Sequence, residues 1–576
     1  MRLTIQVLVH CFCLGLYLVP IFQPNINGGP TLDELHIMNK DNQDIHGSAT
    51  LLQIFSNDYW GRPMMSESSH KSWRPLTVLS FRYLKGISIS DQLTMHRCVN
   101  VITHAAAAEV VGILSTRLFP GRDHLFLLRM ITKASFAMHG SHVEVTCNAA
   151  NRNHILAVFF SAILCDPFCP LLLVVMALVC GFLCSETFLF QVPAAAVTLV
   201  VLQNYTRRKT VAPKSEKQSL SSVILEHLSS ALSVTPRLVL MMFSMFLYLG
   251  GRYYFDTLDI PEGLIRPAEN PFYHFSGQHR ARNYLYVLAV HIAKSWGLDP
   301  IGFSHEYGFD CVPALESWTD PRLALPLLIA ILLFSSVLLA LRYPRQLLGP
   351  VAIHFAWLMT LFPISGLVKV GTFISDRIVV ASSVSVCLWV GLALHFWVTR
   401  GVHMLPAKPL QCLLAAWTFA VCYARVHTRT LQWMDSISLL ESSLETCPRF
   451  AKAHMEMSKV YSGLFPNLHD LRKSRHHLDI ALSIDPNLCD IHQQYAHVAI
   501  QEGKYLEYES ELVEAILCPF TMGGAIEMWQ RYWPAALSSA KSENERWQIQ
   551  QRQDEYSRAI QERAQLKQEE EERTSS

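Results

Sequence analysis

Up to residue 424 the chain alternates long apolar runs with polar segments, which is typical of a protein that crosses a membrane many times. The first run, Leu3 to Phe22, holds no charged residue and has the length of about 20 residues that a bilayer core requires. No small-residue cleavage site follows it, so we interpret it as an uncleaved signal anchor. Ten further runs occupy residues 96–116, 124–141, 154–165, 168–184, 187–203, 237–251, 323–341, 350–368, 378–399 and 409–424. With the anchor they predict about eleven crossings in an all-α membrane protein, whereas the run 284–296 is expected to lie in the interface or to re-enter.

The basic residues orient these runs. The strongest basic cluster, Arg207 to Lys209 followed by Lys214 and Lys217, indicates that its loop is cytoplasmic. Counting crossings from that loop puts the N-terminus in the cytoplasm, and the polar segments 23–92 and 252–322 on the far side together with everything after residue 425. For a chain that stays in the early secretory pathway, the far side is the lumen of the endoplasmic reticulum.

The composition narrows the class of protein further. Hydrophobic residues make up 51% of the 576 positions and charged residues 16%, against about 25% charged in ordinary soluble domains. This excludes a disordered or fibrous protein, and a net charge of +1 gives no reason to expect a nucleic-acid partner. None of the 15 cysteines falls in an array with zinc spacing. Cys447, Cys489 and Cys518 lie in the predicted lumenal tail and could pair there, but the sequence assigns no bridge.

After residue 424 the long apolar runs give way to a repeating helical pattern. The dipeptides Cys447-Pro448, Asp485-Pro486 and Cys518-Pro519 recur at spacings of 38 and 33 residues, close to the 34-residue period of tetratricopeptide repeats. The first repeat contains about four extra residues, 465–468. The alternative is an unrelated bundle of helical hairpins. From residue 541 the chain is almost entirely charged or amide-bearing and predicts a solvated helix.

These patterns divide the chain into segments. They are a signal-anchor span at 1–22, a first lumenal loop with an acidic pair at 23–94, transmembrane helices at 95–251, a second lumenal loop at 252–322, transmembrane helices at 323–424, lumenal repeats at 425–540 and a charged C-terminal helix at 541–576.

The first candidate for chemistry is the adjacent pair Asp33 and Glu34, eleven residues beyond the first span. Carboxylates just outside a membrane are placed to act as a general base on an acceptor hydroxyl, although a solvated surface pair has the same composition. Lys71 and Arg74 follow among tryptophans and could bind a phosphate at the interface. The alternative is an aromatic belt with snorkelling cations.

A second set of ionisable residues lies within or beside later apolar runs, where such groups are costly and are functional candidates by default. His142 and Glu144 are two possible metal ligands, which is too few for a convincing site. Arg152 follows them, and Arg377 is expected at the lumenal end of a span, where it suits a phosphate or simply snorkels. Glu109 and Glu186 also lie in or near apolar runs, and the alternative to a functional role for them is pairing with Arg or His inside the bundle. No phosphate-binding loop, GxSxG, HExxH or dinucleotide motif occurs.

Several short blocks, in their order along the chain, resemble those of the transmembrane and tetratricopeptide repeat-containing family of protein O-mannosyltransferases. The blocks are Asp33-Glu34, Asn57 to Gly61, His70 to Leu76, Met95 to Asn100, His139 to Glu144, Asn151-Arg152, Glu269 to Pro271, Asn283 to Tyr286, Phe362 to Ser365 and Asp376-Arg377. Each block alone is weakly specific, and the order followed by repeats is what carries the resemblance. The chain departs from the family pattern at Gly140, in the segment Cys184 to Thr187 and at Gly366, and its repeat array is short.

The resemblance implies a GT-C fold and an inverting transfer of mannose from dolichyl phosphate mannose to Ser or Thr hydroxyls of secretory proteins, cadherin-type domains among them. It implies Asp33 or Glu34 as the base, with no basis for choosing between them. Arg74, His142 and Arg377 are then candidates for stabilising the charge on the leaving phosphate; Lys71, Glu144 and Arg152 complete the candidate binding set. Neither a metal nor another cofactor is expected.

Two other classes of protein remain as alternatives. A non-catalytic membrane scaffold, with repeats that bind a lumenal partner, agrees with the short array and the departures from the pattern. A transporter would show matching Gly/Pro-broken helices in two halves, and the sequence shows no such pair.

Overall fold

The computed structural model describes residues 14–15, 18–66, 69–87, 92–118, 125–210, 219–258, 260–261, 264–372, 374–400 and 408–575. Within these ranges the regular elements are helices, apart from one isolated bridge between Asn57 and Pro63. The chain forms two compact units, which we treat separately. The bundle unit contains Met1–Pro261, Phe272–His305 and Ala314–Ser442; the tail unit contains Glu262–Pro271, Glu306–Pro313 and Ser443–Ser576. Most of the predicted anchor lies outside the described residues, and so do Lys214 and Lys217.

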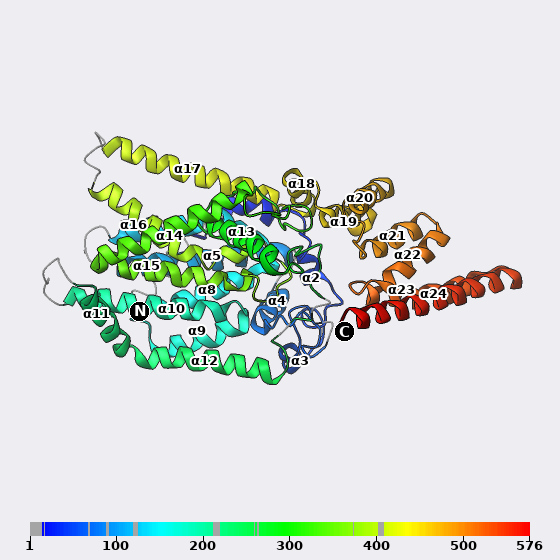
Figure 1. Ribbon diagram of the computed structural model, residues 1–576, viewed down its shortest axis with the longest axis horizontal. Coiled ribbons are helices and arrows are strands. Elements are labelled where there is room, and N and C mark those ends of the chain that lie inside the picture. Colours follow the sequence, from blue (N-terminus) through cyan, green and yellow to red (C-terminus); the bar gives the residue numbers. More distant parts are fainter. Residues whose placement is uncertain are drawn as a thin grey trace. The chain divides into compact units, whose positions relative to one another are not determined.

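The bundle unit is built from helices that run alongside one another (Figure 1). They are α2 (Glu34–Met38), α3 (Leu51–Ser56), α4 (Pro75–Ile87), α5 (Gln92–Leu118), α6 (Leu125–Ala137), α7 (Val143–Cys147), α8 (Arg152–Cys165), α9 (Leu171–Cys184), α10 (Phe188–Thr210), α11 (Leu220–Ser233), α12 (Thr235–Tyr254), α13 (Gly277–Ser295), α14 (Ala324–Arg342), α15 (Pro344–Leu358), α16 (Ser383–Arg400) and α17 (Lys408–Gln432). Short 3₁₀ turns join them: η1 (Gly140–His142), η2 (Ala149–Asn151), η4 (Pro321–Leu323), η5 (Met359–Ile364) and η6 (Asp376–Val379). Each of the ten predicted apolar runs after the anchor coincides with one or more of these elements.

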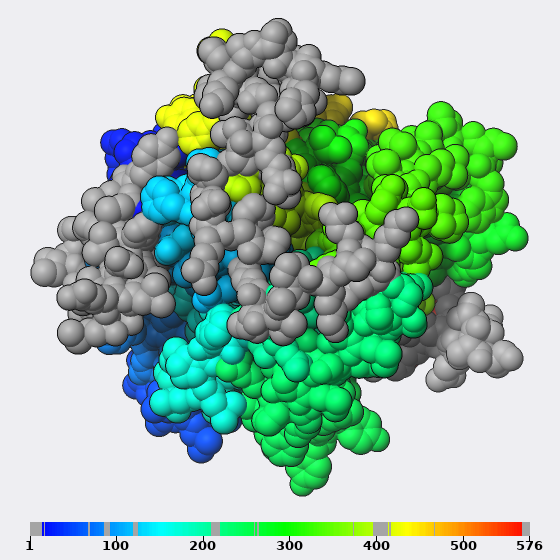
Figure 2. All heavy atoms as spheres, turned by 90° about the vertical axis from the view of Figure 1, so that its left-hand side faces the viewer, coloured from blue at the N-terminus to red at the C-terminus, as the bar shows by residue number. Residues whose placement is uncertain are grey.

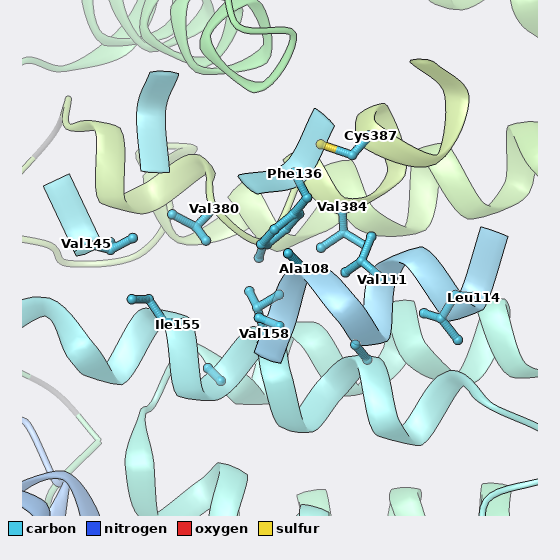
Figure 3. Close-up of a cluster of buried hydrophobic side chains, with 14 of the residues drawn as sticks. Ala108, Val111, Leu114, Phe136, Val145, Ile155, Val158, Val380, Val384 and Cys387 are labelled. Atoms are coloured by element: carbon cyan, nitrogen blue, oxygen red, sulfur yellow. The ribbon is translucent and has the colours of Figure 1, made fainter. Parts of the chain in front are cut away.

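The centre of the bundle unit is a close packing of α5, α6, α8 and α16. Phe136 of α6 is buried among Ala108 of α5, Val158 of α8 and Val384 of α16 (Figure 3). The approach of α5 to α6 requires a small residue at Gly112, because a Cβ there would come within 2.9 Å of the Arg129 carbonyl oxygen. Small residues at helix contacts are the usual means of close packing in membrane bundles.

The number of crossings stays a prediction. Among the described residues, four helices are long and apolar enough to span: Leu93–Leu118, Phe188–Arg208, Pro321–Arg342 and Pro344–Ile364. A fifth candidate is the pair α11 and α12, which bends by 73°. Figure 2 views one end of the bundle, with cyan and green segments along its lower rim. The apolar helices Ala149–Cys165, Leu171–Cys184 and Ser383–His395 are shorter, and at 1.5 Å per residue they fall short of a hydrocarbon core about 30 Å thick. Four or five spanning helices do not confirm the predicted eleven.

The carboxylate of Glu109 is neutralised inside the bundle. Its oxygens contact Arg129 and, at 3.0 Å, the ammonium of Lys133. Because a lone buried carboxylate would cost several kcal/mol, two bases on the facing helix α6 explain how α5 carries it. Pairing inside the bundle, the alternative to a functional role, is confirmed here.

The tail unit consists of packed consecutive helices: α19 (Ala451–Lys459), α20 (Leu471–Ile484), α21 (Ile491–Gln501), α22 (Tyr505–Leu517), α23 (Met522–Ser539) and α24 (Glu543–Ser575). They follow α18 (Ser436–Thr446), which contains the boundary at Ser442. The helices turn where the predicted period places its prolines. The four extra residues of the first repeat, 465–468, follow the irregular turn η7 (Val460–Leu464), and three of them form η8 (Pro466–Leu468). Their assignment as tetratricopeptide repeats stays a prediction.

Two disulfides cross-link the tail unit, Cys311 to Cys447 and Cys489 to Cys518. The sequence had marked three of these cysteines but gave no partner for Cys447. Cys311 belongs to the second predicted lumenal loop, and Cys447 follows the last apolar run. A covalent bond between them requires loop and tail to lie on the same side of the membrane, as the predicted orientation has it.

Candidate active site

The acidic pair is divided by the fold. Glu34 is fully buried, and its carboxylate accepts hydrogen bonds from the backbone N–H groups of Thr31 and Ala149 at 2.9 and 2.8 Å. Arg97, itself completely buried on α5, contacts the same carboxylate at 2.6 Å. Asp33 precedes α2 and is exposed. Two adjacent carboxylates therefore have different surroundings, one inside the protein and one at its surface.

Asp33 faces the segment that connects α7 to α8. The Asn148 side-chain amide approaches one carboxylate oxygen of Asp33 at 3.4 Å. Asn148 is fixed in turn, because its own side-chain oxygen accepts the backbone N–H of Ala150 at 2.9 Å and caps η2. The carboxylate thus retains an exposed face while one oxygen is oriented.

Arg74 immediately precedes α4 and lies beside a buried tyrosine. Its Nε contacts Glu186 at 2.9 Å, and its guanidinium carbon lies 5.1 Å from the centre of the Tyr59 ring. The Tyr59 hydroxyl donates to the Ala150 carbonyl at 2.8 Å, and burial raises the pKa of this phenol. Among the described residues, the two terminal nitrogens of Arg74 have no hydrogen-bond acceptor. Glu186, like Glu109, is paired with a base.

Arg377 lies in η6 and is held by Glu144. One terminal nitrogen contacts the carboxylate at 2.6 Å, and the backbone N–H of Arg377 donates to its other oxygen at 2.8 Å. The Asn151 side chain donates to the same carboxylate at 3.3 Å. Burial raises the pKa of Glu144, and the neighbouring guanidinium opposes this rise. The Arg377 side chain remains 18% exposed.

His154 is a member of the site that the sequence analysis missed. It lies on the first turn of α8, partly exposed, and within electrostatic range of both Arg74 and Arg377. Its position two residues after Arg152 was the only available signal. Two guanidinium groups and an imidazole, which come from the residue before α4, from η6 and from α8, therefore share one neighbourhood.

The other three candidates are occupied by internal contacts. The Lys71 ammonium donates to the carbonyl oxygens of Met64 and Ser66 at 2.8 and 3.2 Å. His142 is buried, with one ring nitrogen 2.7 Å from the Ser383 hydroxyl and the other 3.0 Å from the Phe136 carbonyl.

Arg152 is the third of them. It is almost completely buried and donates to Asn100 at 2.7 Å and to Ser80 at 2.9 Å. Its guanidinium carbon also lies 4.8 Å from the Phe81 ring centre. The Arg152 guanidinium thus joins α4, α5 and α8 through these contacts.

The site forms a single electrostatic neighbourhood. Asp33, Glu34, Arg74 and Arg152 all lie close enough to Tyr59 to act on its ionisation. In the described residues, no group of three or more His, Cys, Asp or Glu side chains is arranged to hold a metal ion. The geometry offers an exposed carboxylate and guanidinium groups that can receive an anion.

The fold and this site define an all-helical membrane protein with a polar site made by its loops and helix ends. The chain is 25% identical over 435 residues to protein O-mannosyl-transferase F38B6.6 of Caenorhabditis elegans, covering 73% of this chain and 55% of that protein. It is 28% identical to protein O-mannosyl-transferase TMTC3 of Mus musculus, covering 72% of this chain and 45% of the mouse protein. The human TMTC3 protein matches at 25% identity over 72% of this chain and 45% of its own length.

These similarities confirm the resemblance that the ordered sequence blocks indicated. The chain spans about half the length of these curated relatives. No protein-family model matches the sequence. No solved structure matches it either.

Proposed function

We propose that the chain is a protein O-mannosyltransferase that transfers mannose from dolichyl phosphate mannose to Ser or Thr hydroxyls of secretory proteins. The observation that carries this proposal is the exposed carboxylate of Asp33, which shares the neighbourhood of Tyr59 with Arg74, while Arg74 and Arg377 both lie near His154. The names of the related proteins support the reaction class. The donor, the acceptors and the residue roles below are part of the proposal.

Asp33 is the base in this mechanism. A general base must be able to reach the hydroxyl of the acceptor, and Asp33 is exposed whereas Glu34 is enclosed. Asn148 orients one oxygen of Asp33. The carboxylate takes the hydroxyl proton while the acceptor oxygen attacks the anomeric carbon from the side opposite the phosphate. One displacement inverts the sugar from β in the donor to α in the product.

Arg74 and Arg377 receive the phosphate that leaves. Charge-assisted hydrogen bonds from guanidinium groups are the strongest contacts that a protein offers to phosphate oxygens. Arg74 retains two nitrogens for this purpose, because only its Nε is used by Glu186. His154 lies close to both guanidinium groups and is placed to make a third contact. Charge that develops on the bridging oxygen in the transition state is stabilised by the same groups.

The remaining candidates build the site rather than touch the donor. Glu34 joins α2 to α5 and to the segment before α8 through its contacts with Arg97 and Ala149. Glu144 holds Arg377. Lys71, His142 and Arg152 have internal partners that fix the surrounding backbone.

The proposed location is the membrane of the endoplasmic reticulum with the tail in the lumen. The two disulfides of the tail unit support this, because structural disulfides persist in oxidising compartments. Acceptor proteins are then secretory or cell-surface proteins, and cadherin-type domains are among them. The helical hairpins of the tail unit would hold such a polypeptide.

The test is transfer of labelled mannose from dolichyl phosphate mannose in microsomes that contain the full chain. The variant is Asp33→Asn, and Asp41→Asn is its control because it removes another exposed carboxylate of the same loop. We expect Asp33→Asn to abolish transfer to a panel of extracellular cadherin domains and Asp41→Asn to retain it. Absence of transfer by a correctly inserted wild-type chain would contradict the proposal and favour the scaffold.

A further inference from the structure

The chain bends by 73° between α11 and α12 in the bundle unit. The helix α12 has 20 residues, and at 1.5 Å per residue it matches a hydrocarbon core about 30 Å thick. Where α12 crosses the bilayer, the bend therefore turns α11 towards the plane of the membrane.

The helix α11 lies at the end of the bundle unit opposite to α2, α3 and α4 (Figure 1). Asp33 and Arg74 directly precede α2 and α4. With these two site residues on the lumenal side, α11 belongs to the cytoplasmic side. The basic cluster that begins at Arg207 predicts the same side for the loop before α11.

One face of α11 is an apolar stripe that the rest of the bundle unit leaves uncovered. The side chains of this stripe fall on one side of the helix by their spacing, and they are between 43% and 76% exposed: Ile224, Leu225, Leu228 and Leu232. The opposite side of the helix carries the buried residues Val223 and Ser230, and α11 packs on α10 and α15. The stripe therefore points away from the protein.

Two guanidinium groups at the end of α10 lie beside this stripe. Arg207 donates to the carbonyl and hydroxyl oxygens of Ser229, the neighbour of Leu228, at 2.9 and 3.1 Å. Arg208 contacts the carboxylate of Glu226 at 2.8 Å. Glu226 is the one Asp, Glu, Lys or Arg in the sequence of α11. Two cations and one carboxylate leave a net positive charge along this edge of the stripe.

An apolar stripe with cations along its edge fits the interface of an anionic leaflet. A helix in the interface buries its apolar face among acyl chains, and the anionic lipids of the cytoplasmic leaflet attract basic residues close to the surface. We propose that α11 lies in the cytoplasmic leaflet and that Arg207 and Arg208 beside it bind the head group of an anionic phospholipid. This interaction surface goes beyond the proposed function and does not depend on it.

A second copy of the chain would also cover the stripe. It would, however, bring a second set of guanidinium groups to the same surface, and like charges oppose such a contact. The charge beside the stripe therefore favours the lipid leaflet as its occupant.

Two leucines with the same exposure allow a matched test of the stripe. Leu225 on α11 and Leu506 on α22 are both 64% exposed, so serine at either position removes little packing within the protein. Leu506 belongs to the tail unit, after the last predicted span. Leu225→Ser should weaken lipid binding about tenfold, the lower limit for the loss of one buried leucine, and Leu506→Ser should not weaken it.

The measurement is the thermal midpoint of the full chain in one detergent, titrated with dioctanoyl phosphatidylserine or dioctanoyl phosphatidylcholine. A ligand that binds the folded state raises the midpoint according to its affinity, and we expect phosphatidylserine to bind more tightly. Arg207→Gln should weaken phosphatidylserine about fivefold, the loss expected for one cation at an anionic surface, and leave phosphatidylcholine unchanged. Arg207→Lys should retain the binding.

The control for Arg207→Gln is Arg322→Gln. Arg322 contacts a single carboxylate, that of Asp320 at 2.7 Å, and belongs to the second predicted lumenal loop. This variant should bind both lipids like wild type. Midpoints without lipid establish that every variant is folded.

Other results would overturn the inference. Equal affinity for the two lipids would remove the role of head-group charge, and phosphoserine that acts as strongly as phosphatidylserine would indicate a site for soluble anions. Binding unaffected by Leu225→Ser would place the lipid away from α11. A wild type that is dimeric by light scattering, with a monomeric Leu225→Ser variant, would show that a second copy covers the stripe.

Discussion

The buried contact between Glu34 and Arg97 gives the sharpest prediction about stability. Both side chains are completely inaccessible, and they are joined by contacts of 2.6 and 3.1 Å. Arg97→Met removes the cation and leaves the carboxylate of Glu34 inside the protein with neutral donors only, the N–H groups of Thr31 and Ala149 and the Thr31 hydroxyl. Removing one partner of a buried pair costs about 3–5 kcal/mol, because the other charge is left uncompensated.

The double variant separates the loss of a partner from the loss of the pair. In Glu34→Gln with Arg97→Met no charge remains, although the single amide oxygen can accept only one of the N–H groups of Thr31 and Ala149, which donate to different oxygens of the carboxylate. We expect this protein to be more stable than the Arg97→Met variant. The double-mutant cycle of wild type, Glu34→Gln, Arg97→Met and the double variant should then show a coupling free energy well above 1 kcal/mol.

Thermal midpoints of the four purified proteins in one detergent measure this cycle, and mannose transfer is measured on the same samples. The Arg97→Met midpoint should fall by several degrees, whereas Asp33→Asn should leave it near wild type and abolish transfer. Ordinary surface substitutions change the free energy of unfolding by less than about 0.5 kcal/mol. A midpoint shift for Arg97→Met that corresponds to so small a change would refute the reasoning that Glu34 is a structural carboxylate.

Three further outcomes are expected. Arg74→Lys lowers kcat/KM for the donor by about 10- to 100-fold, since an ammonium cannot reproduce the guanidinium fork; steady-state transfer at varied donor concentration measures this. Cys489→Ser opens the loop closed at Cys518 and costs about 3.6 kcal/mol by the chain-entropy relation for the 29-residue separation, seen as a lower unfolding midpoint without reductant. Burial lowers the pKa of His477, which lies 3.0 Å from His454, to about 4. Its unfolded form takes up a proton below about pH 6.5, so stability is present above that pH and falls towards pH 4; His477→Gln should flatten this dependence in melting curves.

Local sequence patterns were sufficient for the helices and insufficient for the site. Apolar periodicity depends on neighbouring residues, so every predicted run after the anchor coincides with helical structure. The number of crossings did not follow in the same way, because the short run 154–165 was counted as a crossing, and the helix that contains it, Ala149–Cys165, is still too short to cross alone. The prolines at 448, 486 and 519 located the turns of the tail, because proline disfavours helix continuation in the residue before it.

The roles of adjacent ionisable residues depended on distant partners. Asp33 and Glu34 are equivalent in composition, and their difference arises from Arg97 on α5, 63 residues away from Glu34. Cys311 gave no sign that it pairs with Cys447, 136 residues later. His154 looked like a residue of an apolar helix until the fold brought two arginines near it. Long-range pairing of this kind has no periodic signature.

The position of Arg377 shows how far such dependence extends. Its neighbour Asp376 contacts the ammonium of Lys294 at 2.8 Å, and Lys294 is fully buried on α13. The same ammonium contacts Asp299 at 2.8 Å, and Asp299 in turn contacts Arg425 at 2.7 Å on α17. Each charge in this series is compensated by the next one. The position of the Arg377 guanidinium in the site therefore depends on η6, α13 and α17, which are far apart in the sequence. Motifs can therefore identify the residues of such a site, while the pairing network decides which of them face the substrate.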